Sequence, residues 1–254
     1  RAYAEEYARA DHWQMGANRR NEAVRGQSQA VVDALLAHNV RGKVLDVGAG
    51  WGTVLDQMRE RGIDCEGVEP SREMRAYCVS QGHLVHECEL ENLEARQRYA
   101  ALTFSSVFEH LVAHDACLQA ARTLLRPGGL LISLQPTALF PTFAATVVRL
   151  GIRRLPLPQL HHVLCPPWHT VLFSISGMRA LLARHGFTLL SVSIAPQQRD
   201  TGWTRLAQAA LERVNRAGWR MAGTRWPLAV GHIFVFKKNG TAPAETAGQG
   251  QEGA

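Results

Sequence analysis

Residues 43–52 read Lys-Val-Leu-Asp-Val-Gly-Ala-Gly-Trp-Gly, and this stretch decides the fold. It predicts a buried parallel strand that runs directly into a glycine-rich turn and then into a helix. Glycines at the alternate positions 48, 50 and 52 let the backbone turn tightly and let a ligand approach it closely. Seventeen residues beyond Gly52, a second apolar strand ends in Val68-Glu69-Pro70, which places a carboxylate beside the turn. The turn and the acid together indicate a nucleoside-binding site.

Apolar strands and amphipathic helices alternate on both sides of this stretch as far as Leu134. Such alternation is typical of right-handed crossovers, so it predicts a doubly wound, Rossmann-like α/β sheet. Two later strands, separated by an arginine-rich helix, predict an antiparallel edge. The expected strands are 43–47, 63–69, 83–88, 99–106, 130–134 (after a turn at Pro127-Gly128-Gly129), 187–194 and 231–236; the expected helices are 21–38, 52–61, one capped by Ser71, one capped by Asp115, one begun by Ser174 or Ser176, and 203–222.

Length and composition suit one globular domain. The chain has 254 residues, of which 46% are hydrophobic and 20% are charged. It contains no run of about 18 apolar residues and opens without a secretory signal pattern. Its five cysteines are scattered and form no Cys-x-x-Cys pair, which indicates a reducing compartment. We therefore expect a cytoplasmic protein, with peripheral membrane association as an alternative.

We divide the chain into four segments. They are an N-terminal helical segment (1–40), a cofactor-binding core (41–136), a substrate lid with the C-terminal part of the same domain (137–238) and a disordered tail (239–254).

The charge is divided unevenly along the chain. Residues 1–136 carry 15 Lys/Arg against 18 Asp/Glu, a net of −3, whereas residues 137–230 carry 11 arginines against two acids, a net of +9. The helix expected at 203–222 has an apolar face, with arginines over much of the rest. The apolar face consists of Leu206, Ala210, Val214, Ala217 and Met221, and the neighbouring tryptophans are Trp203, Trp219 and Trp226.

Two interpretations of this helix follow from its pattern. Either its apolar face packs on the sheet and leaves a solvated basic face, or the basic patch attracts an anionic partner. That partner is a membrane surface, at which the tryptophans would also lie, or an anionic acceptor. Neither this helix nor the arginine-containing stretch at 147–154 is similar to a module that reads nucleic acid grooves, so we expect no nucleic acid partner.

The spacing of the turn bears on which nucleoside it binds. A turn for NAD has the pattern Gly-x-Gly-x-x-Gly, whereas this turn reads Gly-x-Gly-x-Gly with Asp46 two residues before the first glycine. An acid at this point would repel a pyrophosphate but would suit the cationic α-amino group of S-adenosylmethionine. The alternatives are an NAD-linked oxidoreductase and a tight turn without a ligand.

With these motifs, the chain resembles class I S-adenosylmethionine-dependent methyltransferases, and among them the ubiquinone-biosynthesis O-methyltransferase-like group. The resemblance extends from about Trp13 to Lys237. Its motifs are Val44-Leu45-Asp46-Val47-Gly48-Ala49-Gly50-Trp51-Gly52, Gly67-Val68-Glu69-Pro70-Ser71, Phe104-Ser105-Ser106-Val107-Phe108-Glu109-His110-Leu111, Leu125-Arg126-Pro127-Gly128-Gly129-Leu130, Pro166-Pro167-Trp168-His169 through Phe173-Ser174, and Arg184-His185-Gly186-Phe187.

The resemblance implies a seven-stranded sheet whose last strand is antiparallel, with helical lid insertions. It implies that the methionyl part of the cofactor is held by Asp46, Gly48, Ala49, Gly50 and Gly52. It also implies that Glu69, followed by Pro70, binds the ribose, that Glu89 and the backbone of Leu90 contact adenine, and that Ser105 lines the cofactor site. For Glu89 the alternative is a solvated acidic loop.

Two positions depart from the family pattern. Tyr99-Ala100 stands where the family usually has Phe-Asp, which removes one polar contact. Some members carry Glu-x-x-Glu-His as divalent-cation ligands after the fourth strand, whereas this chain has Ser106-Val107-Phe108-Glu109-His110. Because magnesium prefers several oxygen ligands, we expect no metal here.

Methyl transfer to a hydroxyl benefits from a general base, and histidine is the usual choice. His110 follows the fourth strand at the carboxyl edge of the sheet, where α/β sites assemble. Its alternative role is to fix the loop. His169 is the second candidate, and His161 and His162 are weaker ones. The spacing of these histidines with Cys165 suggests zinc superficially, but a substrate-covering loop is the preferred interpretation.

From these patterns we expect a methyltransferase that uses S-adenosylmethionine on a small-molecule or lipid-like acceptor, most readily at a hydroxyl oxygen. Nitrogen or carbon acceptors, and a binding protein without turnover, stay as alternatives. The sequence leaves the acceptor and the oligomeric state open.

Overall fold

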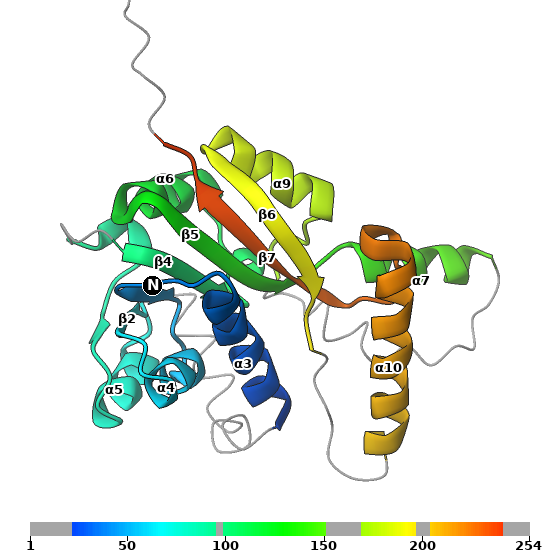
Figure 1. Cartoon of the computed structure of the whole chain (residues 1–254), viewed down its shortest axis with the longest axis horizontal. Coiled ribbons are helices and arrows are strands. Elements are labelled where there is room, and N and C mark those ends of the chain that lie inside the picture. The colour runs from blue at the N-terminus through cyan, green and yellow to red at the C-terminus, as the bar shows by residue number, and fades with distance from the viewer. Residues whose placement is uncertain (1–21, 95–98, 151–168, 197–203, 241–254) are drawn as a thin grey trace, which may run out of the picture.

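The computed structural model describes residues 22–94, 99–150, 169–196 and 204–240. A seven-stranded sheet runs through the molecule in the order β3-β2-β1-β4-β5-β7-β6 (Figure 1). The strands are β1 Val44–Val47, β2 Cys65–Val68, β3 Val85–His86, β4 Tyr99–Ser105, β5 Leu125–Pro136, β6 Phe187–Ile194 and β7 Gly231–Lys238. The helices are α3 Glu22–Ala37, α4 Thr53–Glu60, α5 Arg72–Ser80, η2 Leu90–Asn92, η3 Phe108–His110, α6 His114–Leu124, α7 Leu139–Arg149, α9 Ile175–Arg184, α10 Thr204–Ala222 and η4 Gly223–Arg225.

The strand directions confirm the expected α/β fold. Strands β1 to β5 pair in parallel, and β7 runs antiparallel to both β5 and β6. The first strand neighbours β2 on one side and β4 on the other, so the chain reverses its direction of winding at β1. In α/β sheets, ligands bind at the carboxyl ends of the strands beside such a switch point.

Helices cover both faces of the sheet and create two apolar cores. On one face, the large side chains of β4, β5 and β7 pack against α6 and α9. On the other face, α3 and α4 pack against β1, β5 and β7. Because the parallel strands are buried on both faces, they are apolar along nearly their whole length. The polar exceptions therefore mark the candidate site.

Two local predictions are wrong. Ala113, not Asp115, occupies the N-cap of α6, and Asp115 instead accepts from Arg184 (3.1 Å) and lies 2.8 Å from His185 Nε2. The residues Pro127-Gly128-Gly129 do not precede β5 but lie within it, at a shift of its register with β4. The predicted caps at Ser71 and Ser174 are confirmed, since each side chain accepts from a backbone N–H three residues later.

Several sequence-based expectations fall outside the described residues. They concern most of the N-terminal segment, the proposed loop with His161, His162 and Cys165, Trp203, and the tail beyond Gly240. Within the described parts of the chain, no helix is both long and apolar enough to cross a bilayer.

Candidate cofactor and acceptor site

The glycine turn leaves a stretch of backbone open at the carboxyl end of β1. Gly48 and Gly50 have φ angles of 66° and 53°, in the region that favours glycine. A Cβ on Gly48 would lie 2.8 Å from Cγ2 of Val107, so packing alone requires glycine there. A Cβ on Gly50 would have no neighbour closer than the Gly48 carbonyl oxygen at 4.0 Å. The backbone at Gly50 is thus accessible to an approaching group.

Glu69 connects this turn to the next one. Its Oε2 accepts from the Gly50 backbone N–H and its Oε1 from the Ser71 backbone N–H, both at 2.8 Å. The side chain is only 5% exposed. A carboxylate oxygen has two lone pairs and can accept more than one hydrogen bond, so these contacts are compatible with a ligand at Glu69. The structure therefore places Glu69 against the turn, as the sequence predicted, and adds a structural role.

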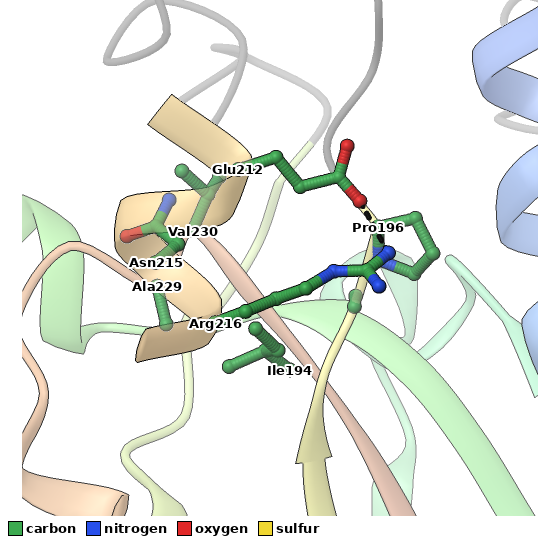
Figure 2. Close-up of a pocket in the computed structure, with 8 residues that line it drawn as sticks. Ile194, Pro196, Glu212, Asn215, Arg216, Ala229 and Val230 are labelled. Atoms are coloured by element: carbon green, nitrogen blue, oxygen red, sulfur yellow. Dashed lines mark hydrogen bonds and ion pairs between the residues drawn. The ribbon is translucent and has the colours of Figure 1, made fainter. Parts of the chain in front are cut away.

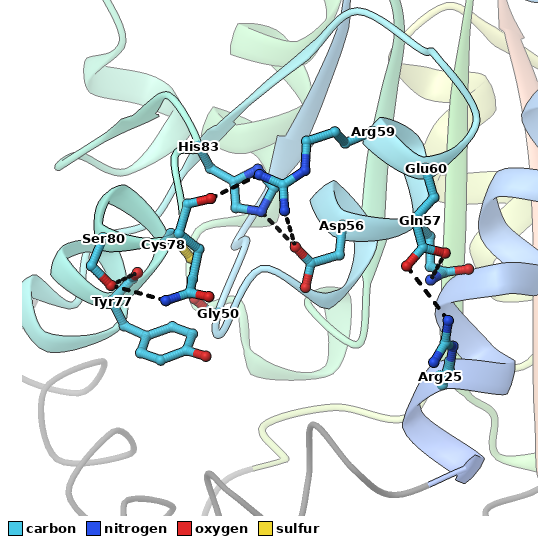
Figure 3. A network of polar contacts seen from close by, with 11 residues as sticks. Arg25, Gly50, Asp56, Gln57, Arg59, Glu60, Tyr77, Cys78, Ser80 and His83 are labelled. Atoms are coloured by element: carbon cyan, nitrogen blue, oxygen red, sulfur yellow. Dashed lines mark hydrogen bonds and ion pairs between the residues drawn. The ribbon is translucent and has the colours of Figure 1, made fainter.

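Polar contacts of α4, α5 and the residues that follow α5 lie beside the turn (Figure 3). Asp56 Oδ1 accepts from Arg59 Nη2 at 3.1 Å and lies 2.7 Å from His83 Nε2. The Cys78 thiol donates to the Gly50 carbonyl oxygen at 3.2 Å. This last contact fixes the turn through the Gly50 carbonyl, while the Gly50 N–H donates to Glu69.

Asp46 is a buried carboxyl group next to the turn. It is 1% exposed, and its Oδ1 accepts from Thr103 Oγ1 at 2.6 Å. Burial raises the pKa of Asp46 to about 7; the hydrogen bond from Thr103 lowers this pKa, and the charge of Glu69 raises it. A cation that arrived beside Asp46 would therefore shift it toward the ionised form.

The other predicted cofactor residues lie along the same edge of the sheet. Ala49 is buried, and its N–H donates to the Val68 carbonyl oxygen at 3.0 Å, which ties the turn to β2. Pro70 and Ser105 are half-buried at the ends of β2 and β4. Glu89 is exposed at the N-cap of η2, and the Leu90 side chain is buried in the core. Their contacts with a cofactor stay predictions.

The two candidate bases, His110 and His169, are neighbours. Their ring centroids are 5.0 Å apart in an edge-to-face arrangement. His110 belongs to η3, directly after β4. His169 comes from a distant segment that is fixed by Thr170, whose N–H donates to the Glu109 carbonyl oxygen at 2.7 Å. The sequence presented the two histidines as alternatives, whereas the fold brings them together.

Glu109 joins this pair. It is buried, its Oε2 has no hydrogen-bond partner among the described residues, and burial raises its pKa to about 8. One potential ligand atom from each of Glu109, His110 and His169 lies within 4.8 Å of the others. A carboxylate with two imidazoles suits zinc or a similar transition metal better than magnesium. The expectation of no metal stays a prediction.

A second polar cluster was missed in the sequence. Gln135 on β5 and His232 on β7 are cross-strand partners, and both are buried. Gln135 Oε1 and His232 Nε2 lack partners among the described residues. His232 Nδ1 lies 3.0 Å from Thr137 Oγ1, and burial lowers the pKa of His232 to about 4, so the ring is neutral. The sequence did contain a signal for this cluster, because Gln135 and His232 are polar residues within otherwise apolar strands.

A cavity lies at the same edge, beyond this cluster. It has a volume of about 160 Å³ and lies between the end of β6, α10 and the segment before β7 (Figure 2). Its lining includes Ile194, Pro196, Asn215 and an ion pair between Glu212 and Arg216 at 2.6 Å. The edge therefore carries, in order of strands, the glycine turn, the His110 cluster, the Gln135–His232 pair and the cavity.

The family assignment follows from a sequence comparison. A model of the methyltransferase domain family matches residues 17–192, which is more than half of the chain. The chain belongs to this family. The assignment confirms the resemblance inferred from the motifs.

Curated relatives match a shorter part of this methyltransferase domain. The ubiquinone biosynthesis O-methyltransferase of Acinetobacter baumannii (strain AYE) is 31% identical over 99 residues, which cover 34% of this chain and 40% of the relative. The protein of the same name from Bradyrhizobium diazoefficiens is 27% identical over 112 residues, covering 42% and 44%. The chain thus spans about two fifths of the length of the curated relatives it matches.

Solved structures share the fold over nearly the whole chain. A Burkholderia thailandensis 1,6-didemethyltoxoflavin-N1-methyltransferase, solved with its ligand and S-adenosylhomocysteine, has a TM-score of 0.60 at 14% identity, covering 94% of this chain and 88% of that one. A magnesium protoporphyrin IX methyltransferase from Synechocystis PCC 6803, with bound S-adenosylhomocysteine, has a TM-score of 0.60 at 14% identity, covering 92% and 98%. Both comparisons concern the fold alone.

Proposed function

We propose that this methyltransferase domain moves a methyl group from S-adenosylmethionine to a small-molecule or lipid-like acceptor, most readily to a hydroxyl oxygen. One observation carries the proposal: the accessible Gly50 backbone lies next to two buried carboxyl groups, Asp46 and Glu69. Such carboxyl groups favour a ligand that brings a cation and a pair of hydroxyls. S-adenosylmethionine has both, whereas a pyrophosphate has neither.

The residues fit this cofactor in distinct ways. Asp46 provides a negative charge for the α-amino group, and its raised pKa shows that such a charge lacks compensation in the described part of the chain. Glu69 is our candidate to accept hydrogen bonds from the ribose hydroxyls, a role that its two carboxylate oxygens suit. Glu89 and the Leu90 backbone stay our candidates for contacts with adenine. When bound, S-adenosylmethionine supplies an electrophilic methyl group on a sulfonium.

The chain's own contribution to the reaction is alignment and proton removal. His110 or His169 accepts the hydroxyl proton of the acceptor as the oxygen becomes a nucleophile. Because their rings touch, one histidine can take the proton while the other orients it. Gln135 and His232 are our candidates for binding a polar group of the acceptor, since both have buried atoms without described partners.

Two alternatives remain, a nitrogen acceptor and a binding protein without turnover. The Burkholderia neighbour is named as an N1-methyltransferase, so a nitrogen acceptor is compatible with this fold. A binding protein without turnover would need the cofactor residues but neither histidine. The neighbouring positions of His110 and His169 favour the enzyme.

Calorimetry and an acceptor screen test the proposal in two steps. Titration with S-adenosylmethionine, S-adenosylhomocysteine and NAD should show binding of the first two only. A screen of phenols, amines and quinol-like lipids, read by release of S-adenosylhomocysteine, then identifies the acceptor. Binding of NAD alone would overturn the cofactor assignment. Cofactor binding with no product release from any acceptor would favour the non-catalytic alternative.

A further inference from the structure

The helix α10 contacts the rest of the described chain through Asn215, Trp219 and the residues that line the cavity. Figure 1 shows it standing off the end of the sheet, apart from the helices that cover the two faces. Trp226 Nε1 donates to Oδ1 of the buried Asn215 at 2.9 Å, and the Trp219 ring centroid lies 5.1 Å from that of His232. These contacts connect α10 to the segment before β7 and to β7 itself, and the expectation that the tryptophans lie at a membrane stays a prediction.

The apolar face of α10 points outward. Its described members are Ala210, Val214, Ala217 and Met221, all exposed, with Val214 at 51% and Met221 at 89%. Their spacing of four, three and four residues places them in one stripe along the helix. The first interpretation from the sequence, in which this face packs on the sheet, is therefore wrong. A stripe of this kind exposes apolar surface that a monomeric protein normally buries.

Arginines flank the stripe on one side. Arg213 and Arg220 are exposed, and within the described ranges neither forms an ion pair. Glu212 is the only acid in α10; its side chain is 12% exposed and pairs with Arg216, facing the cavity (Figure 2). The outward surface of the helix is thus apolar and positively charged. We call Arg213, Val214, Ala217, Arg220 and Met221 the α10 surface.

We propose that the α10 surface docks onto an anionic lipid bilayer, with the helix axis parallel to the membrane plane. An interfacial helix inserts its apolar stripe just below the headgroups, while its basic residues contact anionic phosphates. The stripe of Val214, Ala217 and Met221 suits the acyl-chain boundary. The two adjacent arginines, which form no ion pair within the described ranges, suit the anionic headgroups.

Other occupants fit less well. A nucleic acid would bind the arginines but offers no apolar layer for Met221. A second copy, packed by two-fold symmetry, would bring Arg213 and Arg220 against the same arginines of its partner, and like charges repel.

Vesicle flotation tests this proposal. The full chain is mixed with vesicles of phosphatidylcholine alone and with vesicles that also contain phosphatidylglycerol, at low and at high sodium chloride. We expect flotation with the anionic vesicles only, and weaker binding at high salt. The double variant R213Q/R220Q should weaken binding roughly thirty-fold, at about five-fold per arginine. The double variant V214S/M221S should weaken it at both salt concentrations.

A matched control separates local contacts from net charge. Arg41 and Arg126 are exposed near the amino ends of β1 and β5, at the opposite edge of the sheet, so R41Q/R126Q removes the same charge elsewhere. It should float like the unchanged protein. Far-UV circular dichroism checks that all variants stay folded, which is expected for exposed positions.

Three results would overturn the proposal. They are no flotation at any salt concentration, equal loss of binding in R41Q/R126Q and R213Q/R220Q, and equal binding to neutral vesicles. Light scattering adds a fourth: a dimer that V214S/M221S dissociates, without vesicle binding, would assign the surface to a second copy. Cofactor binding is measured separately, so failure here leaves the proposed methyl transfer standing.

Discussion

Asp46 shows how one buried carboxyl group links cofactor affinity to pH. Its pKa of about 7 means that it is protonated in acid and ionised above neutrality. Because only the ionised form attracts a cationic amino group, we predict that S-adenosylmethionine binds roughly ten-fold more tightly at pH 7.5 than at pH 6. Calorimetry across this range measures the dissociation constant, and buffers of different ionisation enthalpy should reveal proton release on binding.

The variant Asp46→Asn is the control for this prediction. It keeps the size of the side chain and removes the titration, so its affinity should be weak and independent of pH. An unchanged slope of affinity with pH in this variant would assign the effect to another group.

The sequence pattern predicted the candidate cofactor residues because they lie at the carboxyl ends of strands, Asp46 within β1 and Glu69 directly after β2; their contacts with a cofactor stay predictions. Asp46 and Glu69 lie where the sequence placed them. The sequence pattern showed Glu109 only as part of an incomplete metal motif. Its burial could not be predicted, because it depends on residues far along the chain. Gln135 and His232 could not be paired from the sequence, since their contact depends on the register between β5 and β7.

Two elements that are distant in the sequence build the candidate catalytic pair. The segment η3 carries His110, and the segment before α9 carries His169. If the two rings act as one unit, His110→Asn and His169→Asn should each lower kcat by about 10²- to 10⁴-fold, and the double variant should lose little more. The measurement is product release with the acceptor identified in the screen, for both single variants and the double variant.

A control comes from His38, which directly follows α3 and is half-buried; it is remote from these elements, so His38→Asn should keep full activity. If the fold-reduction in kcat of the double variant equals the product of the two single reductions, the histidines act independently. Activity that a chelator abolishes and zinc restores would instead assign Glu109, His110 and His169 to a metal site.

Most element positions followed from the hydrophobic pattern, because most helices bury one apolar face and the parallel strands are apolar along nearly their whole length. The exceptions share a physical cause. The α6 cap at Asp115 was wrong because tertiary partners, Arg184 and His185, bind its carboxylate. The orientation of α10 was wrong because periodicity identifies an apolar face but not what covers it. Long-range packing decides both.

For the molecule as a whole, the buried titratable groups set an unusual dependence of stability on pH. The pKa values of Asp46 and Glu109 are raised to about 7 and about 8, so the ligand-free folded state holds two protons that the unfolded chain has released. Their contribution to stability is fully present only below the ordinary pKa values of 3.8 and 4.5, and it is lost progressively as pH rises from there through 7 and 8. Burial lowers the pKa of His232 to about 4. Its contribution to stability is therefore present above its ordinary pKa of 6.5 and is lost as pH falls toward 4.

We therefore predict that the melting temperature of the ligand-free protein falls by at least about 5 °C between pH 6 and pH 8.5. Calorimetric scans measure it directly. The double variant D46N/E109Q should flatten the dependence, and saturating S-adenosylmethionine should raise the melting temperature most at the alkaline end. A melting temperature that rises over this range would contradict the assigned pKa shifts.

The placement of α10 has a consequence for how this protein can change over time. Strands β6 and β7 are hydrogen-bonded neighbours along almost their entire length, so a short hairpin turn would join them equally well. The excursion through residues 195–230 is therefore dispensable for closing the sheet. If α10 docks onto membranes as we propose, changes in this segment should alter membrane binding, whereas the candidate cofactor site lies elsewhere in the sheet, at β1 and β4.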